Sequence, residues 1–292
     1  MRAVLPLIYL AAGWALARMG IDFRRGMSRA LSLAIIPVVI VFHVASGTVE
    51  LAGLMLCAFA WMLALFVAGR CLSRDPIDTL CFCYLNIGWL GLPVASATLG
   101  PPAIGLFTAF YVASSILGNG LGPAWLRRHG PENTPAGWLG HAWRTPALRA
   151  LLLGLCLLPF GSWLTTHAAW LNDAARLLLG LMGMMVLGAW LAQAPVGVPE
   201  LLRTLRWFGW RAAVSLPALA LLWALTSRLG DSPLRGQFQG LVLLSLLPPA
   251  ANIVVLETEA LKTGASASRI AGASIWSLCA IAIFVAWIHL AA

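Results

Sequence analysis

The sequence predicts an all-α membrane protein with about ten transmembrane helices in a five-plus-five inverted repeat. Three observations predict this fold class. The 292 residues are 61% hydrophobic and 10% charged, whereas a soluble domain carries about 25% charged residues. Apolar, charge-poor stretches close to the ~20 residues of a membrane-spanning helix recur along the whole chain. Two of these stretches, the fourth and the ninth, are interrupted by helix-breaking residues.

The expected spans are, in chain order, 3–17, 30–49, 51–69, 79–99, 102–122, 150–170, 177–198, 208–227, 236–256 and 270–290. The uncharged run 79–126 is too long for one span, and the turn signal at 100–102 divides it into two. The first span is short, and the eighth contains Arg211. Residues 1–17 also resemble a cleaved signal peptide, but the arginines that follow oppose export of the next segment.

The domain organisation follows from the longest hydrophilic stretch, 123–149. It separates a first five-helix unit, residues 1–122, from a second, residues 150–292. An odd number of spans in each unit turns the second upside down relative to the first, if the two share a fold. This is the inverted-repeat architecture of many secondary transporters.

The net charge of +9 is distributed by side of the membrane. With ten spans, 15 Lys and Arg residues fall in or beside the loops that follow spans 1, 3, 5, 7 and 9, and only 4 fall on the other side (Arg2, Arg176, Arg228 and Arg235). By the positive-inside rule, both termini then lie outside the cytoplasm. The charge is therefore a topology signal, and we expect no nucleic-acid partner. Six scattered cysteines without CxxC spacing indicate packing residues, so we expect no metal and no cofactor.

The interruptions carry the candidate site. Span 4 reads NIGWLGLP over 86–93, and span 9 contains two prolines followed by an asparagine. A broken helix exposes backbone N–H groups and a partial positive charge at membrane depth, which favour an anion. Matching interruptions in two halves are the best sequence indication of a transporter's site, although each alone is also compatible with a plain kink. The candidate substrate-binding residues are Asn86, Gly88, Gly91, Pro93, Pro248, Pro249 and Asn252.

Other polar residues are weaker candidates. His43 and Glu257 are considered for ion or proton coupling. A packed histidine is the commoner alternative for His43, and Glu257 could lie in the cavity or at the cytoplasmic interface. The glycine-rich segment 118–122, which includes Asn119, is typical of close helix packing.

The two breaks resemble the auxin efflux carrier family, whose bacterial members are commonly described as malonate or organic-anion transporters. The matching segments are NIGWLGLPVASATLG at 86–100 and LPPAANIVVLE at 247–257, with SRALSLAIIPVVIVFHVASG at 28–47 and LPALALLWAL at 216–225 as weaker matches. The resemblance implies ten spans, crossing broken helices 4 and 9, and a carboxylate substrate. Leu256, Glu257 and Thr258 depart from it, because members often carry an aromatic residue there.

The sequence therefore leads us to expect a secondary transporter that moves a small organic anion across a bacterial cytoplasmic membrane by alternating access. Sodium or a proton is the candidate coupling ion, the lipid bilayer is the surrounding partner, and a homodimer is a candidate assembly. No P-loop motif is present to bind ATP. A membrane sensor of the same fold is the main alternative. A membrane-embedded enzyme is the weaker one, because no HExxH or GxSxG motif occurs.

Overall fold

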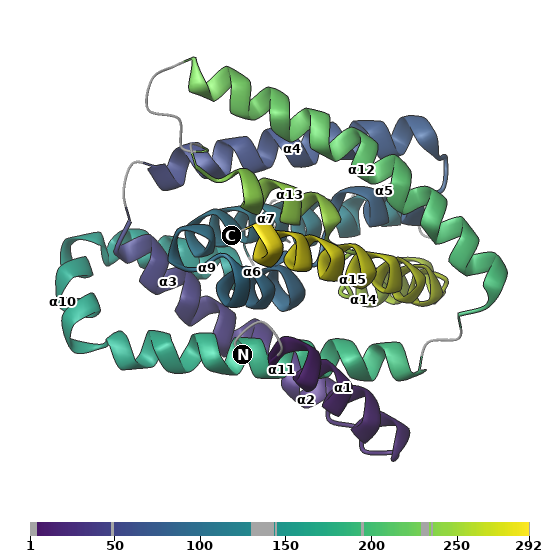
Figure 1. Cartoon of the computed structure of the whole chain (residues 1–292), viewed down its shortest axis with the longest axis horizontal. Helices are drawn as coiled ribbons and strands as arrows, with labels where there is room; N and C mark the ends of the chain where they lie inside the picture. Colours follow the sequence, from purple (N-terminus) through teal and green to yellow (C-terminus); the bar gives the residue numbers. More distant parts are fainter. Residues whose placement is uncertain are drawn as a thin grey trace.

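The computed structural model describes residues 5–47, 50–129, 143, 145–193, 196–228, 234 and 236–291. All regular elements in these ranges are helices (Figure 1). They are α1 (Leu5–Arg18), α2 (Arg24–Ala30), η2 (Leu31–Ile35), α3 (Ile36–Ala45), α4 (Glu50–Leu72), α5 (Pro76–Cys83), η3 (Ile87–Gly91), α6 (Leu92–Thr98), α7 (Pro101–Arg127), α9 (Pro146–Cys156), η4 (Leu158–Phe160), α10 (Gly161–His167), α11 (Ala169–Gln193), α12 (Val198–Ser227), α13 (Phe238–Leu246), α14 (Ile253–Leu261) and α15 (Ser266–Ala291).

Six helical segments are long and apolar enough to cross a membrane: Arg24–Ala45, Gly53–Leu72, Ala103–Arg127, Ala169–Gln193, Val198–Ser227 and Ser266–Ile288. A bent pair, Pro146–Cys156 with Leu158–His167, would be a seventh. The chain is thus an all-α, multi-span membrane protein, as its composition predicts. The other three expected spans do not reach this length, because α1 has 14 residues and the fourth and ninth stretches are divided into short helices.

The sixth expected span, 150–170, differs from the prediction because it is not one continuous helix. Its two parts meet at an angle of 62°, and the bend contains a short 3-10 turn with Pro159 in it. Proline cannot donate a helical hydrogen bond and collides with the preceding turn, which accounts for the change of direction. The expected loop 123–149 is also shorter, because α7 continues to Arg127 and α9 begins at Pro146. Most of the intervening segment lies outside the described residues.

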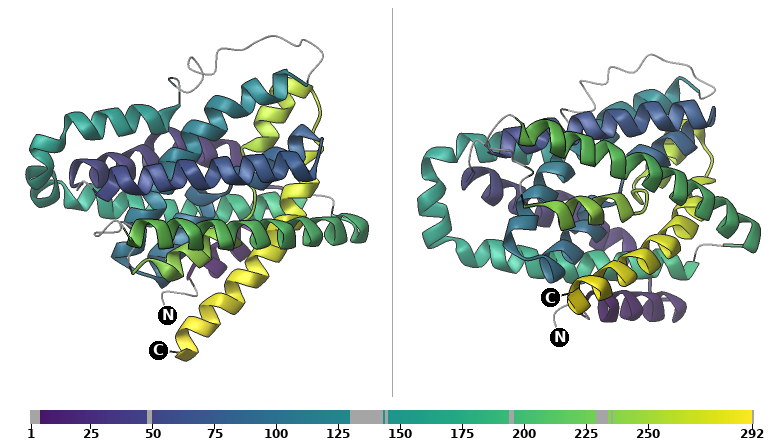
Figure 2. Two further views of the ribbon diagram at one scale, coloured as in Figure 1. Left: turned by 90° about the horizontal axis from the view of Figure 1, so that it is seen from above. Right: turned by 45° about the horizontal axis from the view of Figure 1, so that its top comes forward.

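The helices form two packing groups. In one, α1, α2 and α3 pack with α9, α10 and α11, and in the other α4, α5 and α7 pack with α12, α13, α14 and α15. The helices α4, α11 and α12 run along the long axis of the molecule (Figure 1). The turns from α4 to α5 and from α11 to α12 lie at one end of this axis, and the start of α4 and the end of α12 lie at the other. The end of α15 extends beyond the other helices (Figure 2).

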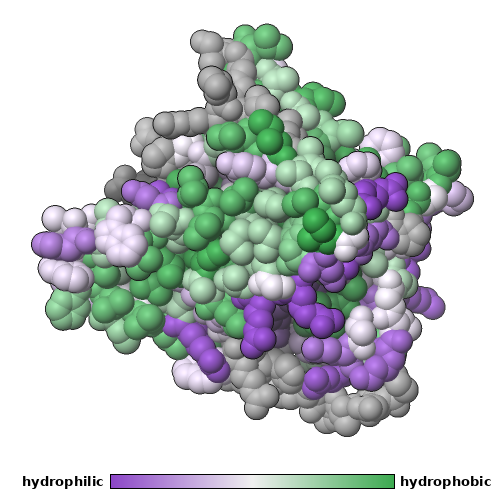
Figure 3. All heavy atoms as spheres, turned by 90° about the horizontal axis from the view of Figure 1, so that it is seen from below, coloured by the Kyte–Doolittle hydropathy of each residue, from purple (hydrophilic) through white to green (hydrophobic). Residues whose placement is uncertain are grey.

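The outer surface is apolar over broad areas. One face is largely hydrophobic, with most of its hydrophilic residues gathered toward one end (Figure 3). Large side chains are exposed on several helices, for example Leu56 (70%) and Ile283 (72%). In water such a surface would lead to aggregation, whereas in a bilayer it contacts lipid chains.

Candidate functional site

The first break lies at Tyr84–Asn86, which is narrower than the predicted interruption over 86–93. Helix α5 ends at Cys83 and Tyr84 adopts an extended conformation. Asn86 then caps the next helical segment, because its Oδ1 accepts a hydrogen bond from the Trp89 N–H at 3.2 Å. From Ile87 to Thr98 the chain is helical again, first with π-helical and then with α-helical hydrogen bonding. Pro93 therefore lies in the first turn of α6 and does not end a helix.

The second break lies between α13 and α14. Helix α13 ends at Leu246, and Leu247 is extended before the two prolines. Asn252 occupies the position before α14, and its side chain does not cap that helix. The side chain of Asn252 is consequently available for contacts elsewhere.

The two breaks are joined by backbone hydrogen bonds. The Asn86 N–H donates to the Pro248 carbonyl and the Ala250 N–H donates to the Tyr84 carbonyl, both at 2.8 Å. Leu85 and Pro249 face each other in an antiparallel bridge. Buried backbone groups that a helix no longer pairs need other partners, and these contacts supply some of them. The breaks therefore form one structural unit although they are far apart in the sequence.

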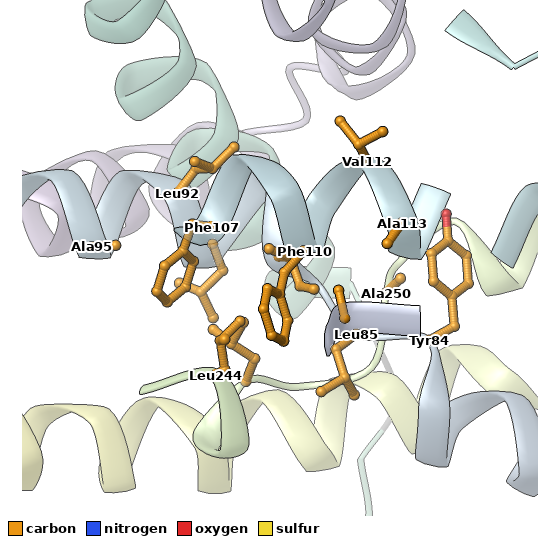
Figure 4. Close-up of a cluster of buried hydrophobic side chains, with 14 of the residues drawn as sticks. Tyr84, Leu85, Leu92, Ala95, Phe107, Phe110, Val112, Ala113, Leu244 and Ala250 are labelled. Atoms are coloured by element: carbon orange, nitrogen blue, oxygen red, sulfur yellow. The ribbon is translucent and has the colours of Figure 1, made fainter. Parts of the chain in front are cut away.

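Apolar side chains pack beside this unit. Phe107 and Phe110 of α7 point toward Leu244 of α13, and Leu85 lies next to Phe110 (Figure 4). The phenyl rings of Phe107 and Phe110 are fully buried. This cluster holds the crossing segments against α7 through the burial of apolar surface.

A cavity of about 280 Å³ lies on one side of the joined breaks. Three of the seven predicted substrate-binding residues, Asn86, Gly88 and Asn252, line it. The remaining lining residues are Ser32, Tyr84, Leu85, Trp89, Tyr111, Ser115, Asn119, Thr145, Pro146, Ala147, Ala250 and Ala251. Both breaks therefore contribute to one cavity.

The other predicted residues shape the surroundings of the cavity and do not line it. Gly91 leaves room for the side chains of Leu247 and Phe107, because a Cβ there would lie 2.9 and 3.0 Å from them. Pro248 supplies the carbonyl that Asn86 binds. Pro249 forms the bridge to Leu85 and faces a second, smaller pocket.

Helix α7 provides a polar face that sequence reasoning missed. Tyr111, Ser115 and Asn119 are spaced four residues apart, so they lie on one side of the helix, and all three line the cavity. The i, i+4, i+8 spacing of polar residues within an apolar span was a readable signal for this face.

Segment 118–122 is closely packed as expected, because a Cβ on Gly118 would overlap the Tyr84 ring, but Asn119 also reaches the cavity. Its Oδ1 accepts hydrogen bonds from the Tyr84 hydroxyl at 3.2 Å and from Asn252 Nδ2. It thus connects α7 to both breaks.

Asn86 retains an unused donor. The residue is 5% exposed, and its Nδ2 has no hydrogen-bond partner among the described residues. An unpaired buried N–H group costs about 1–3 kcal/mol, so a ligand or water that accepts from it would be favoured. No charged side chain lines the cavity in the part of the chain that the structure describes.

The two candidate coupling residues lie outside this lining. The Glu257 carboxylate is fully buried and accepts hydrogen bonds from Thr263 Oγ1 and from the backbone N–H groups of Ala265 and Ser266, the latter two at 2.8 Å. It therefore caps the start of α15. The imidazole of His43 packs against Gly105 of α7, since a Cβ on that glycine would lie 3.1 Å from the ring.

The chain matches no model of a known protein family and no curated protein.

Proposed function

We propose that the protein is a secondary transporter that moves a small organic anion across a cytoplasmic membrane by alternating access. The observation that carries the proposal is the cavity beside the joined breaks, which contains three asparagines from three different helical segments. Broken helices at membrane depth are tolerated where they line a cavity, and they place helix termini and neutral polar groups around a ligand. The resemblance to the auxin efflux carrier family supports the same function.

The proposal includes ten spans in two inverted five-helix units. The packing pairs support it. In the proposed repeat, α1 of the first unit corresponds to α9–α10 of the second, and α2–α3 corresponds to α11. The contact between α1 and α11 should then have a counterpart between α9 and α3, and both pairs of helices are in contact. In the same way, α4 and α7 correspond to α12 and α15, and the contact between α4 and α7 has its counterpart in the contact between α12 and α15. A pseudo-two-fold relation between the units accounts for both coincidences.

The substrate class follows from the donors around the cavity. Asn86 offers an unpaired N–H group, and the helical segment that starts at Ile87 directs its positive end toward the same space. Neutral donors and helix termini bind a carboxylate without burying an uncompensated charged side chain. The volume of about 280 Å³ suits a mono- or dicarboxylate of a few carbon atoms.

A sensor with the same fold would also bind a ligand at this site, but it would not move the ligand across the bilayer. The decisive experiment is therefore uptake of radiolabelled malonate and acetate into proteoliposomes that contain the full-length protein. Uptake is measured with and without inward sodium and proton gradients. We expect saturable uptake of at least one carboxylate, with no uptake of its amide.

Asn86→Ala and Asn252→Ala test whether the uptake uses this site. Each should lower affinity about ten- to a hundred-fold, because a lost hydrogen bond to a charged ligand costs about 1–3 kcal/mol. Ser114→Ala is the control, since Ser114 is a buried polar residue of α7 that does not line the cavity. Carboxylate binding without uptake would favour the sensor, and uptake unchanged in both asparagine variants would contradict the site.

A further inference from the structure

A second, smaller pocket lies on another side of the joined breaks. Its volume is about 30 Å³, and α5, α12, α15 and the second break contribute residues to it, among them Cys81, Phe208, Arg211, Pro249 and Ala273. Since a cavity needs about 10–15 Å³ to hold a water molecule, this pocket admits one or two groups of that size. It shares no lining residue with the larger cavity.

Most of the charges at this pocket neutralise one another. The Asp78 carboxylate accepts hydrogen bonds from Arg203 at 3.0 Å and from Arg269 at 2.8 Å. Arg269 also contacts Asp75 at 2.8 Å. Two arginines and two aspartates thus form a compensated network that joins α5, α12 and α15.

Arg211 is outside this network. It lies in the middle part of α12 and is 2% exposed, and its Nε and Nη2 have no hydrogen-bond partner among the residues that the structure describes. Its closest described aromatic contact is with the Phe208 ring, whose centroid lies 5.4 Å from Cζ. An arginine does not lose its proton in a protein, so this buried charge needs compensation.

Glu200 does not supply that compensation. Its carboxylate also lines the pocket, but 11 residues separate it from Arg211 along the same helix, a rise of about 16 Å. Glu200 Oε1 itself has no hydrogen-bond partner among the described residues. The guanidinium of Arg211 therefore remains an uncompensated cation in the wall of the pocket.

The unpaired atoms define the chemistry of the ligand. Nε and Nη2 form one edge of the guanidinium, and this edge donates two parallel N–H groups to a single anion. We propose that Arg211 binds one small monovalent anion of the size of chloride in this pocket. The bound anion neutralises the arginine beside Pro249 and holds α12 against α5. A substrate that fills the larger cavity is too large for this pocket.

The anion site is tested with the purified full-length protein in detergent, without any transport measurement. The thermal midpoint of unfolding is followed as sodium gluconate is replaced by sodium chloride at constant ionic strength. We expect a saturable rise with chloride, because a ligand that binds only the folded state raises its stability. Nitrate should act similarly, and the larger sulfate should not. A rise of equal size with all anions, or no rise at all, would overturn the proposal.

Two substitutions assign the effect to this pocket. In Arg211→Met the midpoint should no longer depend on chloride, whereas Arg206→Met, an exposed position on the same helix, should keep the full response. If Arg211→Met does not fold, Ala273→Val provides the second test, because it narrows the pocket without removing the charge. It should weaken the apparent chloride affinity at least ten-fold, and an unchanged affinity would contradict the site.

Discussion

At the scale of single residues, three asparagines from distant parts of the chain meet at the cavity. Asn86 and Asn252 could be predicted as site residues because each lies beside a helix break. Asn119 was missed because it stands between glycines that also indicate close packing, although its four-residue spacing from Ser115 and Tyr111 indicates a polar face of α7. Its role depends on tertiary contacts to Tyr84 and Asn252, and no pattern within residues 118–122 specifies those partners.

The first residue-scale prediction concerns Asn119. Its replacement by alanine removes the acceptor of two hydrogen bonds, one from the Tyr84 hydroxyl and one from Asn252 Nδ2. We expect the free energy of unfolding to fall by about 1–3 kcal/mol and carboxylate affinity to fall as well. Thermal unfolding of the purified variant, with and without malonate, measures both. Ser114→Ala is again the matched control on α7, and equal behaviour of the two variants would rule out a special role for Asn119.

At the scale of elements, the breaks could be predicted from proline, glycine and asparagine, but their boundaries could not. The sequence NIGWLGLP indicated an interruption of eight residues, whereas the helix resumes at Ile87, capped by Asn86, and includes both glycines. The bend at Pro159 was missed because it lies in an apolar run of ordinary span length. The pairing of the two breaks depends on long-range contacts, so no local pattern specifies it, and only the family resemblance implied that helices 4 and 9 cross.

Helix α11 offers an element-scale test of close packing. A Cβ on Gly188 would overlap the backbone carbonyl of Leu10 in α1, whereas a Cβ on Gly180 of the same helix would meet no atom within contact distance. We expect Gly188→Ala to separate α1 from α11 and to lower the thermal midpoint by several degrees. Gly180→Ala should leave it unchanged or raise it slightly, since alanine favours helix formation. Equal midpoints for the two variants would show that this contact is not tight.

At the scale of the whole molecule, two arginines that the charge pattern assigns to opposite sides of the membrane lie at opposite ends of the long axis. Arg70 lies in the last turn of α4 and Arg228 follows α12, and these helix ends point in opposite directions (Figure 1). The composition predicted a multi-span membrane protein, and the helices agree with it. The number of spans was harder to predict, because hydropathy does not distinguish one continuous helix from two short ones.

The orientation is tested by cysteine labelling in a variant that lacks the six native cysteines. We expect Arg25→Cys, an exposed position at the start of α2, to be protected from an impermeant thiol reagent in intact cells. Arg228→Cys, exposed after α12, should react. Both positions should react after the membrane is permeabilised, and labelling of position 25 alone in intact cells would reverse the assigned orientation.

The cavity wall is divided between the two packing groups. Ser32, Thr145 and Ala147 belong to the group of α2, α3 and α9, whereas the hydrogen bonds among Tyr84, Asn119 and Asn252 lie within the other group. In the transport proposed above, a movement of one group relative to the other would therefore change the size and the solvent exposure of the cavity, while the hydrogen bonds among Tyr84, Asn119 and Asn252 would stay within one group. These three side chains would then keep their arrangement during the movement.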